Sequence, residues 1–238
     1  MEASHYGKIY LIPTTLGDTE PLEVLPISIK KAIERIDYFV VENEKTARRF
    51  IKKITPSKKQ VSLKLSVINK YTDPMELPSF LDPCLEGHSI GVISEAGCPG
   101  VADPGADIVA IAHQKNIQVV PLVGPSSILL ALMASGFNGQ NFAFIGYLPI
   151  DNTVRKSAIK RYENQSKSNH QALICIETPY RNNKLFEEFC NSLSPQTKLC
   201  IACDITLPTE YISTKTIADW KRSKIDLHKR PCIFIIQA

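Results

Sequence analysis

The sequence predicts an α/β protein with a largely parallel sheet, divided into two domains. Candidate strands and helices alternate from the start of the chain, which is the pattern of βαβ units. With 238 residues, of which 44% are hydrophobic and 22% charged, the chain has the length and composition of a folded globular protein. A break at 123–125 separates two halves that each contain strands and helices, so we expect domains at 1–123 and 124–238.

In the first half, short apolar runs bounded by turn residues predict the strands. Pro26 either interrupts or begins the first helix, and Asp103 is placed to cap the last one. The segment 55–74 is weakly patterned and contains one short strand. The predicted strands are 8–13, 38–42, 61–65, 88–94 and 117–121. One predicted helix ends near residue 36, and the others occupy 44–54, 78–85 and 104–115.

The second half begins with an apolar helix at 128–135, which Gly136 ends. Strands and helices then alternate to the C-terminus. The predicted strands are 141–147, 171–176, 197–204 and 231–237, and the further helices are 153–162, 180–193 and 216–224.

Composition and charge limit where the protein can be located and which partners it can bind. The formal net charge of +4 permits a nucleic-acid partner without requiring one. No run of 18 or more apolar residues is present, and the first residues lack the basic start and apolar core of a signal peptide. We therefore expect a cytoplasmic protein that does not span a membrane.

The seven cysteines are scattered and odd in number, which favours a reducing compartment. Cys200 and Cys203 have the C-x-x-C spacing of a redox pair or half a zinc site. They fall within a predicted strand, where residues three apart point to opposite faces. No second C-x-x-C and no paired histidines accompany them, so we expect no metal site.

Three loops rich in Gly and Pro follow predicted strands of the first half, at 14–18, 94–104 and 123–127. In an open α/β sheet, ligands bind beyond the carboxyl ends of the strands, so these loops should converge on one crevice. Their composition fixes the backbone and lets a ligand approach main-chain groups closely. The Gly-rich fingerprints of dinucleotide and phosphate sites are absent from the sequence, so the loops alone do not identify the ligand.

The second loop contains Ser94-Glu-Ala-Gly-Cys-Pro99 followed by Asp103-Pro-Gly105. This motif is the most specific match in a resemblance to the tetrapyrrole methylase superfamily of S-adenosylmethionine-dependent methyltransferases. Within that superfamily, the chain resembles the branch that 2′-O-methylates a cytidine of small-subunit ribosomal RNA. Further likeness covers nearly the whole chain in order, at Ile9–Gly17, Val41-Glu42 with Thr46, Arg48 and Arg49, Val120–Ser126, Phe142–Pro149, Glu177–Arg181, and Asp204–Leu207 with Glu210.

The resemblance implies a homodimer of class III methyltransferase fold, with a largely parallel N-terminal sheet, a mixed C-terminal sheet and S-adenosyl-L-methionine in a cleft between the domains. The implied cofactor-binding residues are Pro13, Ser94, Glu95, Gly97, Val101, Asp103, Ser126, Gly146, Tyr147, Leu148, Thr178 and Ile205. The candidate catalytic residues are Glu42 and Glu95, which follow strand ends, and Arg181, which matches a family arginine.

The sequence constrains the methyl acceptor less than the methyl donor. The resemblance and two basic clusters, Lys45 with Arg48 and Arg49, and Arg155 and Lys156 with Lys160 and Arg161, favour ribosomal RNA or the small ribosomal subunit. Each cluster is also compatible with a solvated helix face. Thr15 and Asn43 depart from the ribosomal pattern, which keeps open a small-molecule acceptor such as a tetrapyrrole, or a non-catalytic cofactor- or RNA-binding protein.

Overall fold

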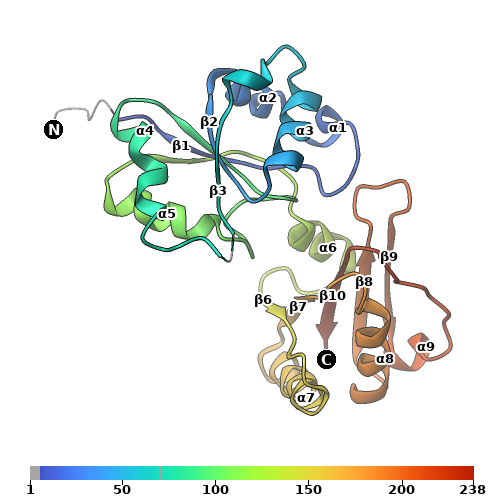
Figure 1. The fold of residues 1–238 in the computed structure, drawn as a ribbon. Helices are drawn as coiled ribbons and strands as arrows, with labels where there is room; N and C mark the ends of the chain where they lie inside the picture. The colour runs from blue at the N-terminus through green and yellow to red at the C-terminus, as the bar shows by residue number, and fades with distance from the viewer. Residues whose placement is uncertain (1–5, 70) are drawn as a thin grey trace. The chain divides into compact units, whose positions relative to one another are not determined.

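The computed structural model describes residues 6–69 and 71–238. The chain forms two compact units, Met1–Ser126 and Ser127–Ala238 (Figure 1). None of the helices in the described part of the chain combines the length and apolar character that a membrane span requires.

The first unit contains a five-stranded sheet in the order β3-β2-β4-β1-β5, and every neighbouring pair is parallel. This confirms the largely parallel N-terminal sheet. The third strand begins later than predicted, because Gln60–Ser62 form a 3₁₀ turn that leaves Val61 exposed. The strands are β1 Ile9–Ile12, β2 Tyr38–Val41, β3 Lys64–Val67, β4 Ile90–Ile93 and β5 Val119–Pro121.

Helices cover both faces of this sheet, as Figure 1 shows. Successive strand residues point to opposite faces, so Ile12 and Val41 pack with helices α2 and α3, whereas Ile9 and Val40 pack in a separate core against α5. The predicted first helix is divided at residues 25–26, and Pro26 is the N-cap of its second part, α2. The helices are α1 Pro21–Val24, α2 Ile27–Arg35, α3 Glu44–Ile54, α4 Asp82–Leu85 and α5 Gly105–Gln114, with a further 3₁₀ helix at Leu77–Leu81.

The second unit contains a mixed five-stranded sheet in the order β6-β7-β10-β8-β9. Only β6 and β7 run parallel, and the other neighbouring pairs are antiparallel, which confirms a mixed C-terminal sheet. The edge strand β9 was not predicted. The strands are β6 Phe142–Tyr147, β7 Ala172–Ile176, β8 Lys198–Cys203, β9 Tyr211–Thr216 and β10 Cys232–Gln237.

Two helices of this unit differ in length from the prediction. Helix α7 continues to Asn169, where His170 ends it in the left-handed conformation at φ 49°. The predicted helix 216–224 contracts to one turn, α9, which buries Trp220 with its Nε1 donating to the Leu199 carbonyl at 2.8 Å. The helices are α6 Ser127–Ser135, α7 Asn152–Asn169, α8 Asn182–Ser192 and α9 Ile217–Trp220.

Candidate active site

The three Gly- and Pro-rich loops of the first unit converge, as the sequence predicts. Strands β4, β1 and β5 are adjacent and parallel, so the loops that follow them leave the same edge of the sheet. The Thr14 backbone N–H donates to the Gly97 carbonyl at 3.0 Å, and the Thr14 hydroxyl donates to the Ser94 carbonyl at 3.3 Å. The Cys98 thiol lies 3.3 Å from the Pro125 carbonyl, which joins the second loop to the third.

Two glycines allow this close approach of backbones. Gly97 has a φ of +73°, a conformation that other residues rarely adopt. A Cβ atom on Gly124 would lie 2.2 Å from Cβ of Pro13, so any side chain at this position would displace the loop. The shape of the crevice therefore depends on small residues at these two positions.

The loop between β4 and α5 is closed by Asp103. Its Oδ1 accepts from the backbone N–H groups of Gly100 and Gly105, at 2.7 and 2.8 Å. Asp103 was expected to cap α5, but Pro104 occupies the N-cap position and the carboxylate instead bonds the first helical N–H. Its Oδ2 is buried and has no partner among the described residues. Burial raises the pKa of Asp103 above its ordinary value.

Two candidate catalytic carboxylates, Glu42 and Glu95, lie together at this edge. Glu42 Oε1 accepts from the Glu95 backbone N–H at 3.1 Å, and Glu95 Oε1 accepts from the Thr46 hydroxyl at 2.5 Å. Burial, followed by the nearby charges of Asp103 and Glu95, raises the pKa of Glu42, although the Glu95 N–H opposes the shift. A carboxyl with a raised pKa is better suited to accept a proton near neutral pH.

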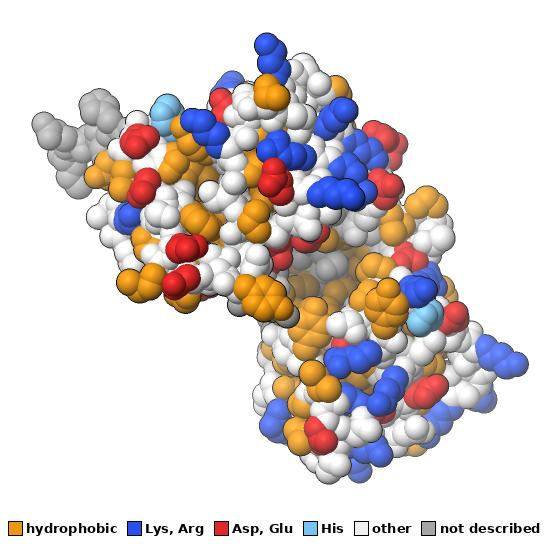
Figure 2. Space-filling view, viewed as in Figure 1, with side chains coloured by type: hydrophobic (Ala, Val, Ile, Leu, Met, Phe, Trp, Pro, Cys, Tyr) orange, Lys and Arg blue, Asp and Glu red, His pale blue; other side chains and the backbone are white. Residues whose placement is uncertain are grey.

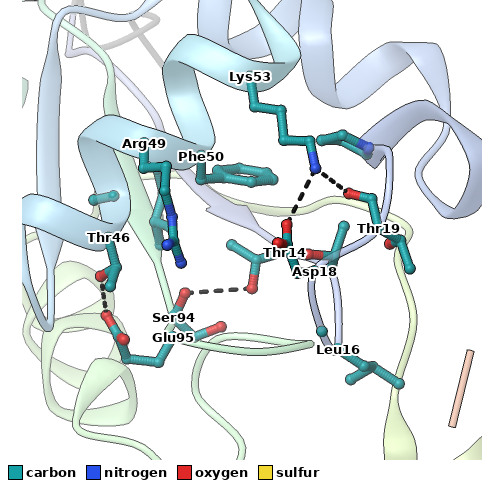
Figure 3. Close-up of a pocket in the computed structure, with 15 residues that line it drawn as sticks. Thr14, Leu16, Asp18, Thr19, Thr46, Arg49, Phe50, Lys53, Ser94 and Glu95 are labelled. Atoms are coloured by element: carbon teal, nitrogen blue, oxygen red, sulfur yellow. Dashed lines mark hydrogen bonds and ion pairs between the residues drawn. The ribbon is translucent and has the colours of Figure 1, made fainter. Parts of the chain in front are cut away.

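A pocket of about 230 Å³ opens beside Glu95, between the loop after β1, helix α3 and the start of the loop after β4 (Figure 3). Thr14, Ser94 and Glu95 line one side of it. The side chains that α3 contributes to the lining are Thr46, Ala47, Arg49, Phe50 and Lys53.

The sequence analysis assigned no role to Phe50 or Lys53. The signal that identifies them is spacing: Thr46, Arg49, Phe50 and Lys53 recur at intervals of three and four residues, which places them on one face of the predicted helix. Lys53 holds the loop after β1, because its amine donates to Asp18 Oδ1 at 3.2 Å and to the Thr19 carbonyl at 2.9 Å.

The predicted residues of the second unit also gather at one sheet edge. Gly146 and Tyr147 end β6, and Leu148 follows it. Thr178 follows β7, which is parallel to β6, and Ile205 follows β8, which runs in the same direction as β7. Gly146 has a φ of +68° and lies at an irregularity in β6. Leu148 and Ile205 are buried, whereas Tyr147 is exposed.

Arg181 contacts the carboxylate that precedes it in the same motif. Its guanidinium donates to both oxygens of Glu177, at 2.6 and 2.7 Å. Glu177 is buried and also accepts from the Thr178 backbone N–H at 2.6 Å. The Nε of Arg181 is buried and has no partner within the described residues.

One residue of the predicted basic clusters is structural. Arg155 is 4% exposed and bonds Glu188 of α8 and the carbonyls of Pro149 and Ile150, so it is neither a phosphate contact nor part of a solvated face. Lys156, Lys160 and Arg161 are exposed. No cluster of His, Cys, Asp and Glu that could hold a metal ion is found in residues 6–69 and 71–238.

Several curated proteins similar to this chain are described as ribosomal RNA small subunit methyltransferase I. The protein from Vibrio cholerae serotype O1 is 25% identical over 211 residues, which cover 89% of this chain and 69% of the relative. The protein from Halalkalibacterium halodurans is 30% identical over 175 residues, or 74% and 56% of the two chains. The protein from Escherichia coli O157:H7 is 23% identical over 234 residues, or 97% and 78%. No protein-family sequence profile matches the chain.

Solved structures with the same fold include two methyltransferases. The methyltransferase CobJ superposes with a TM-score of 0.64 at 16% identity, covering 97% of this chain and 94% of CobJ. Cobalt precorrin-4 methyltransferase CbiF superposes with a TM-score of 0.61 at 15% identity, covering 100% and 97%. At this identity the likeness establishes the fold.

Proposed function

We propose that this chain is a member of the tetrapyrrole methylase superfamily that transfers a methyl group from S-adenosylmethionine to a ribose 2′-oxygen of ribosomal RNA. The likeness to small-subunit ribosomal RNA methyltransferases extends over up to 97% of the chain and carries the proposal. The site supports it with a converged set of rigid loops and two carboxylates at their edge.

The residues of the first unit fit a cofactor that carries hydroxyl and ammonium donors. The unpartnered, buried Oδ2 of Asp103 suits a ribose hydroxyl or an ammonium group. In this unit we assign the cofactor to Pro13, Ser94, Glu95, Gly97, Val101, Asp103 and Ser126. In the second unit we assign it to Gly146, Tyr147, Leu148, Thr178 and Ile205.

Bound S-adenosylmethionine supplies a sulfonium methyl group, which is already activated for transfer. The chain then has to align the acceptor oxygen and accept its proton. Glu42 is suited to the second task, since its raised pKa and its hydrogen bond to the Glu95 N–H hold a basic oxygen beside the loop. Glu95 is the alternative base, and we assign Arg181 to contact with the substrate.

The distribution of charge supports an RNA acceptor. The second unit contains 14 Lys and Arg against 9 Asp and Glu, whereas the first contains 14 against 15, so the positive excess of the chain lies in the second unit. Lys and Arg side chains are spread over this unit, which is the lower one in Figure 2. Helix α7 exposes Lys156 and Lys160 about one turn apart, and Lys167 about two turns further along. Such a surface suits an RNA backbone.

The test uses labelled S-adenosylmethionine and small ribosomal subunits from a strain that lacks the gene. We expect label in the RNA, in a dinucleotide that resists alkaline hydrolysis, because a 2′-O-methyl group blocks cleavage there. Label on a base, or none in subunits and total RNA, would overturn the proposal.

Two alternatives predict other results. A small-molecule acceptor predicts substrate affinity that does not fall steeply with salt, unlike phosphate-dominated binding. A non-catalytic protein predicts binding without turnover, and calorimetry with S-adenosylmethionine detects that binding directly.

The proposal includes a homodimer that works in the cytoplasm, where small ribosomal subunits are found. Light scattering coupled to size-exclusion chromatography distinguishes a dimer from the 26.5 kDa monomer. A single monomeric peak at micromolar concentration would exclude the homodimer.

A further inference from the structure

The pocket of the first unit contains one cation that the protein itself does not use. Arg49 is exposed and lines the pocket, and it forms neither a hydrogen bond nor an ion pair with the described residues. Figure 3 shows its side chain reaching from α3 into the pocket toward Ser94. An unpaired guanidinium over a polar pocket suits a phosphate, which it can bind with two parallel hydrogen bonds.

The other cations of α3 near this pocket are already engaged. Arg48 bonds Glu44 and the Gln60 carbonyl, both at 2.8 Å. Lys53 bonds Asp18 and the Thr19 carbonyl, and lies 3.3 Å from Glu20. Arg49 is therefore the guanidinium on this face that remains available to a ligand, within the part of the chain that the structure describes.

An aromatic ring stands next to this guanidinium. Phe50 is half-buried and packs against the core below α3, while its outer side lines the pocket. Figure 3 shows the ring beside Arg49. Single-stranded RNA is recognised by stacking bases on aromatic side chains and by charged contacts to phosphate.

The pocket is small, and several of its lining residues carry hydroxyl groups. At about 230 Å³ it is smaller than the pockets of roughly 300–1,000 Å³ that enclose drug-sized ligands. Its hydroxyl-bearing lining residues are Thr14, Thr15, Thr19, Thr46 and Ser94. The buried hydroxyl of Thr19 has no partner among residues 6–69 and 71–238. These groups match the hydroxyls of a ribose better than an apolar macrocycle.

We propose that this pocket holds the acceptor nucleotide, unstacked from its neighbours, with Arg49 on its phosphate and Phe50 against its base. Ser94 and Glu95 line the same pocket, so the ribose lies beside the loop assigned to the methyl donor. The inference rests on the proposed RNA acceptor. Arg49 and Phe50 are then positioning residues that determine which nucleotides are methylated.

The experiment compares Arg49→Gln with Lys52→Gln. Lys52 is an exposed cation on the same helix that does not line the pocket, so it is a matched control for net charge. We measure the binding of a fluorescent single-stranded oligoribonucleotide at several salt concentrations, together with KM and kcat for ribosomal RNA. Circular dichroism and thermal melting check the fold of each variant.

We expect Arg49→Gln to weaken oligonucleotide binding and raise KM by about 10- to 100-fold, because a charge-assisted contact is lost. The slope of log affinity against log salt should fall by about 0.7, the value for one contact on a single strand. Arg49→Lys should recover part of the loss, because it keeps the charge but not the two-pronged geometry. Lys52→Gln should leave KM within about twofold of wild type.

Phe50 is tested by Phe50→Tyr and Phe50→Leu. Tyr keeps a ring that can stack, whereas Leu keeps apolar packing without one. We expect Leu to weaken oligonucleotide binding by about fivefold or more and Tyr to bind as wild type does. Equal loss in both variants, with reduced thermal stability, would overturn the stacking role.

The outcomes separate this inference from the proposed function. If wild type methylates RNA and Arg49→Gln binds and methylates it equally well, the inference fails and the function stands. If wild type methylates no RNA but binds the oligonucleotide through Arg49, the proposed function and the acceptor role of the pocket fail, and only RNA binding at Arg49 stands. Absence of oligonucleotide binding by wild type would overturn the pocket assignment.

Discussion

Glu42 accepts a hydrogen bond from the backbone N–H of Glu95, across 3.1 Å and 53 positions of sequence. The bond joins the end of β2 to the loop after β4, so a candidate base and a candidate cofactor loop are fixed relative to each other. The neighbouring Thr46 hydroxyl fixes the Glu95 side chain in turn. This arrangement leads to the first prediction.

Replacing Glu42 with Gln should lower the activity of the protein without lowering its stability. The Gln oxygen can still accept from the Glu95 N–H, but it cannot accept a proton, so kcat should fall by about 100-fold or more. In wild type, kcat should rise with pH through the raised pKa of Glu42 and level off above it. A pH profile of single-turnover methylation measures both effects, and Glu95→Gln shows which carboxylate controls the profile.

The direction in which the same substitution changes stability can also be predicted. Because the pKa of Glu42 is raised in the folded protein, ionising it costs stability as the pH rises above the ordinary value of 4.5 and through the raised pKa. Glu42→Gln removes this cost, so its melting temperature at pH 7 should equal or exceed that of wild type. A clearly lower value would show that the carboxylate mainly supports the fold.

Asp103→Asn and Asp103→Ala should differ in their effects on cofactor binding and on the free energy of unfolding. Asn keeps an acceptor for the N–H groups of Gly100 and Gly105 but loses the charge on the unpartnered oxygen. It should fold normally and bind S-adenosylmethionine about tenfold more weakly. Ala leaves two donors unsatisfied and should lower the free energy of unfolding by about 1–3 kcal/mol. Calorimetry and urea unfolding measure the two effects.

Lys156→Gln with Lys160→Gln should weaken RNA binding without affecting the fold. Both side chains are exposed on α7, so we expect melting within a degree or two of wild type. If both contact phosphates, the salt slope should fall by about one unit for each lysine. A control pair in the first unit, Lys31→Gln with Lys59→Gln, should change the slope little. Equal effects of the two pairs would indicate a general charge effect.

Glu188→Ala should strongly destabilise the second unit. Arg155 and Glu188 are both largely buried, and removing one partner leaves the other charge uncompensated, at a cost of about 3–5 kcal/mol. The Arg155→Met, Glu188→Leu double variant should recover most of this loss. The hydrogen bond from Arg155 lowers the pKa of Glu188. The stability that the ion pair contributes is therefore present above pH 4.5 and is lost as the pH falls through the lowered pKa. Urea unfolding at several pH values measures it.

Gly124→Ala should lower the free energy of unfolding by about 1–3 kcal/mol, because the added methyl group collides with Pro13. Gly139→Ala is the matched control, since a Cβ there meets nothing within 4 Å. If the two variants unfold at the same denaturant concentration, the contact between the first and third loops is looser than described.

Most of the fold could be predicted because its signals are local. The apolar runs of β1, β2 and β4 and the capped, amphipathic α3 appear directly in the sequence, and Asn43 caps α3 as its residue type favours. Strand β9 could not be predicted, because Tyr211–Thr216 mixes polar and apolar residues without alternation and forms through pairing with β8.

The position of the site could be predicted from the sequence, whereas the roles of its individual cations could not. Strand-end positions indicated the three loops, because parallel strands bring their carboxyl ends to one edge. The separate roles of Arg48, Arg49 and Arg155 were not predictable, since they depend on partners such as Gln60 and Glu188 that the sequence does not place. Only the folded chain shows which of three similar cations is free to meet a ligand.

Helix α3 packs against the core and lines the pocket with neighbouring faces. Ile51 and Ile54 are buried in the core, the exposed Arg49 lines the pocket, and Ala47 and Phe50 contribute to both. Variation at the outer, exposed positions such as Arg49 therefore leaves the packing of the domain unchanged. A library restricted to the outer positions should yield altered acceptor preferences from folded proteins, so this one helix offers a route by which related enzymes diversify and by which an engineer could retarget them.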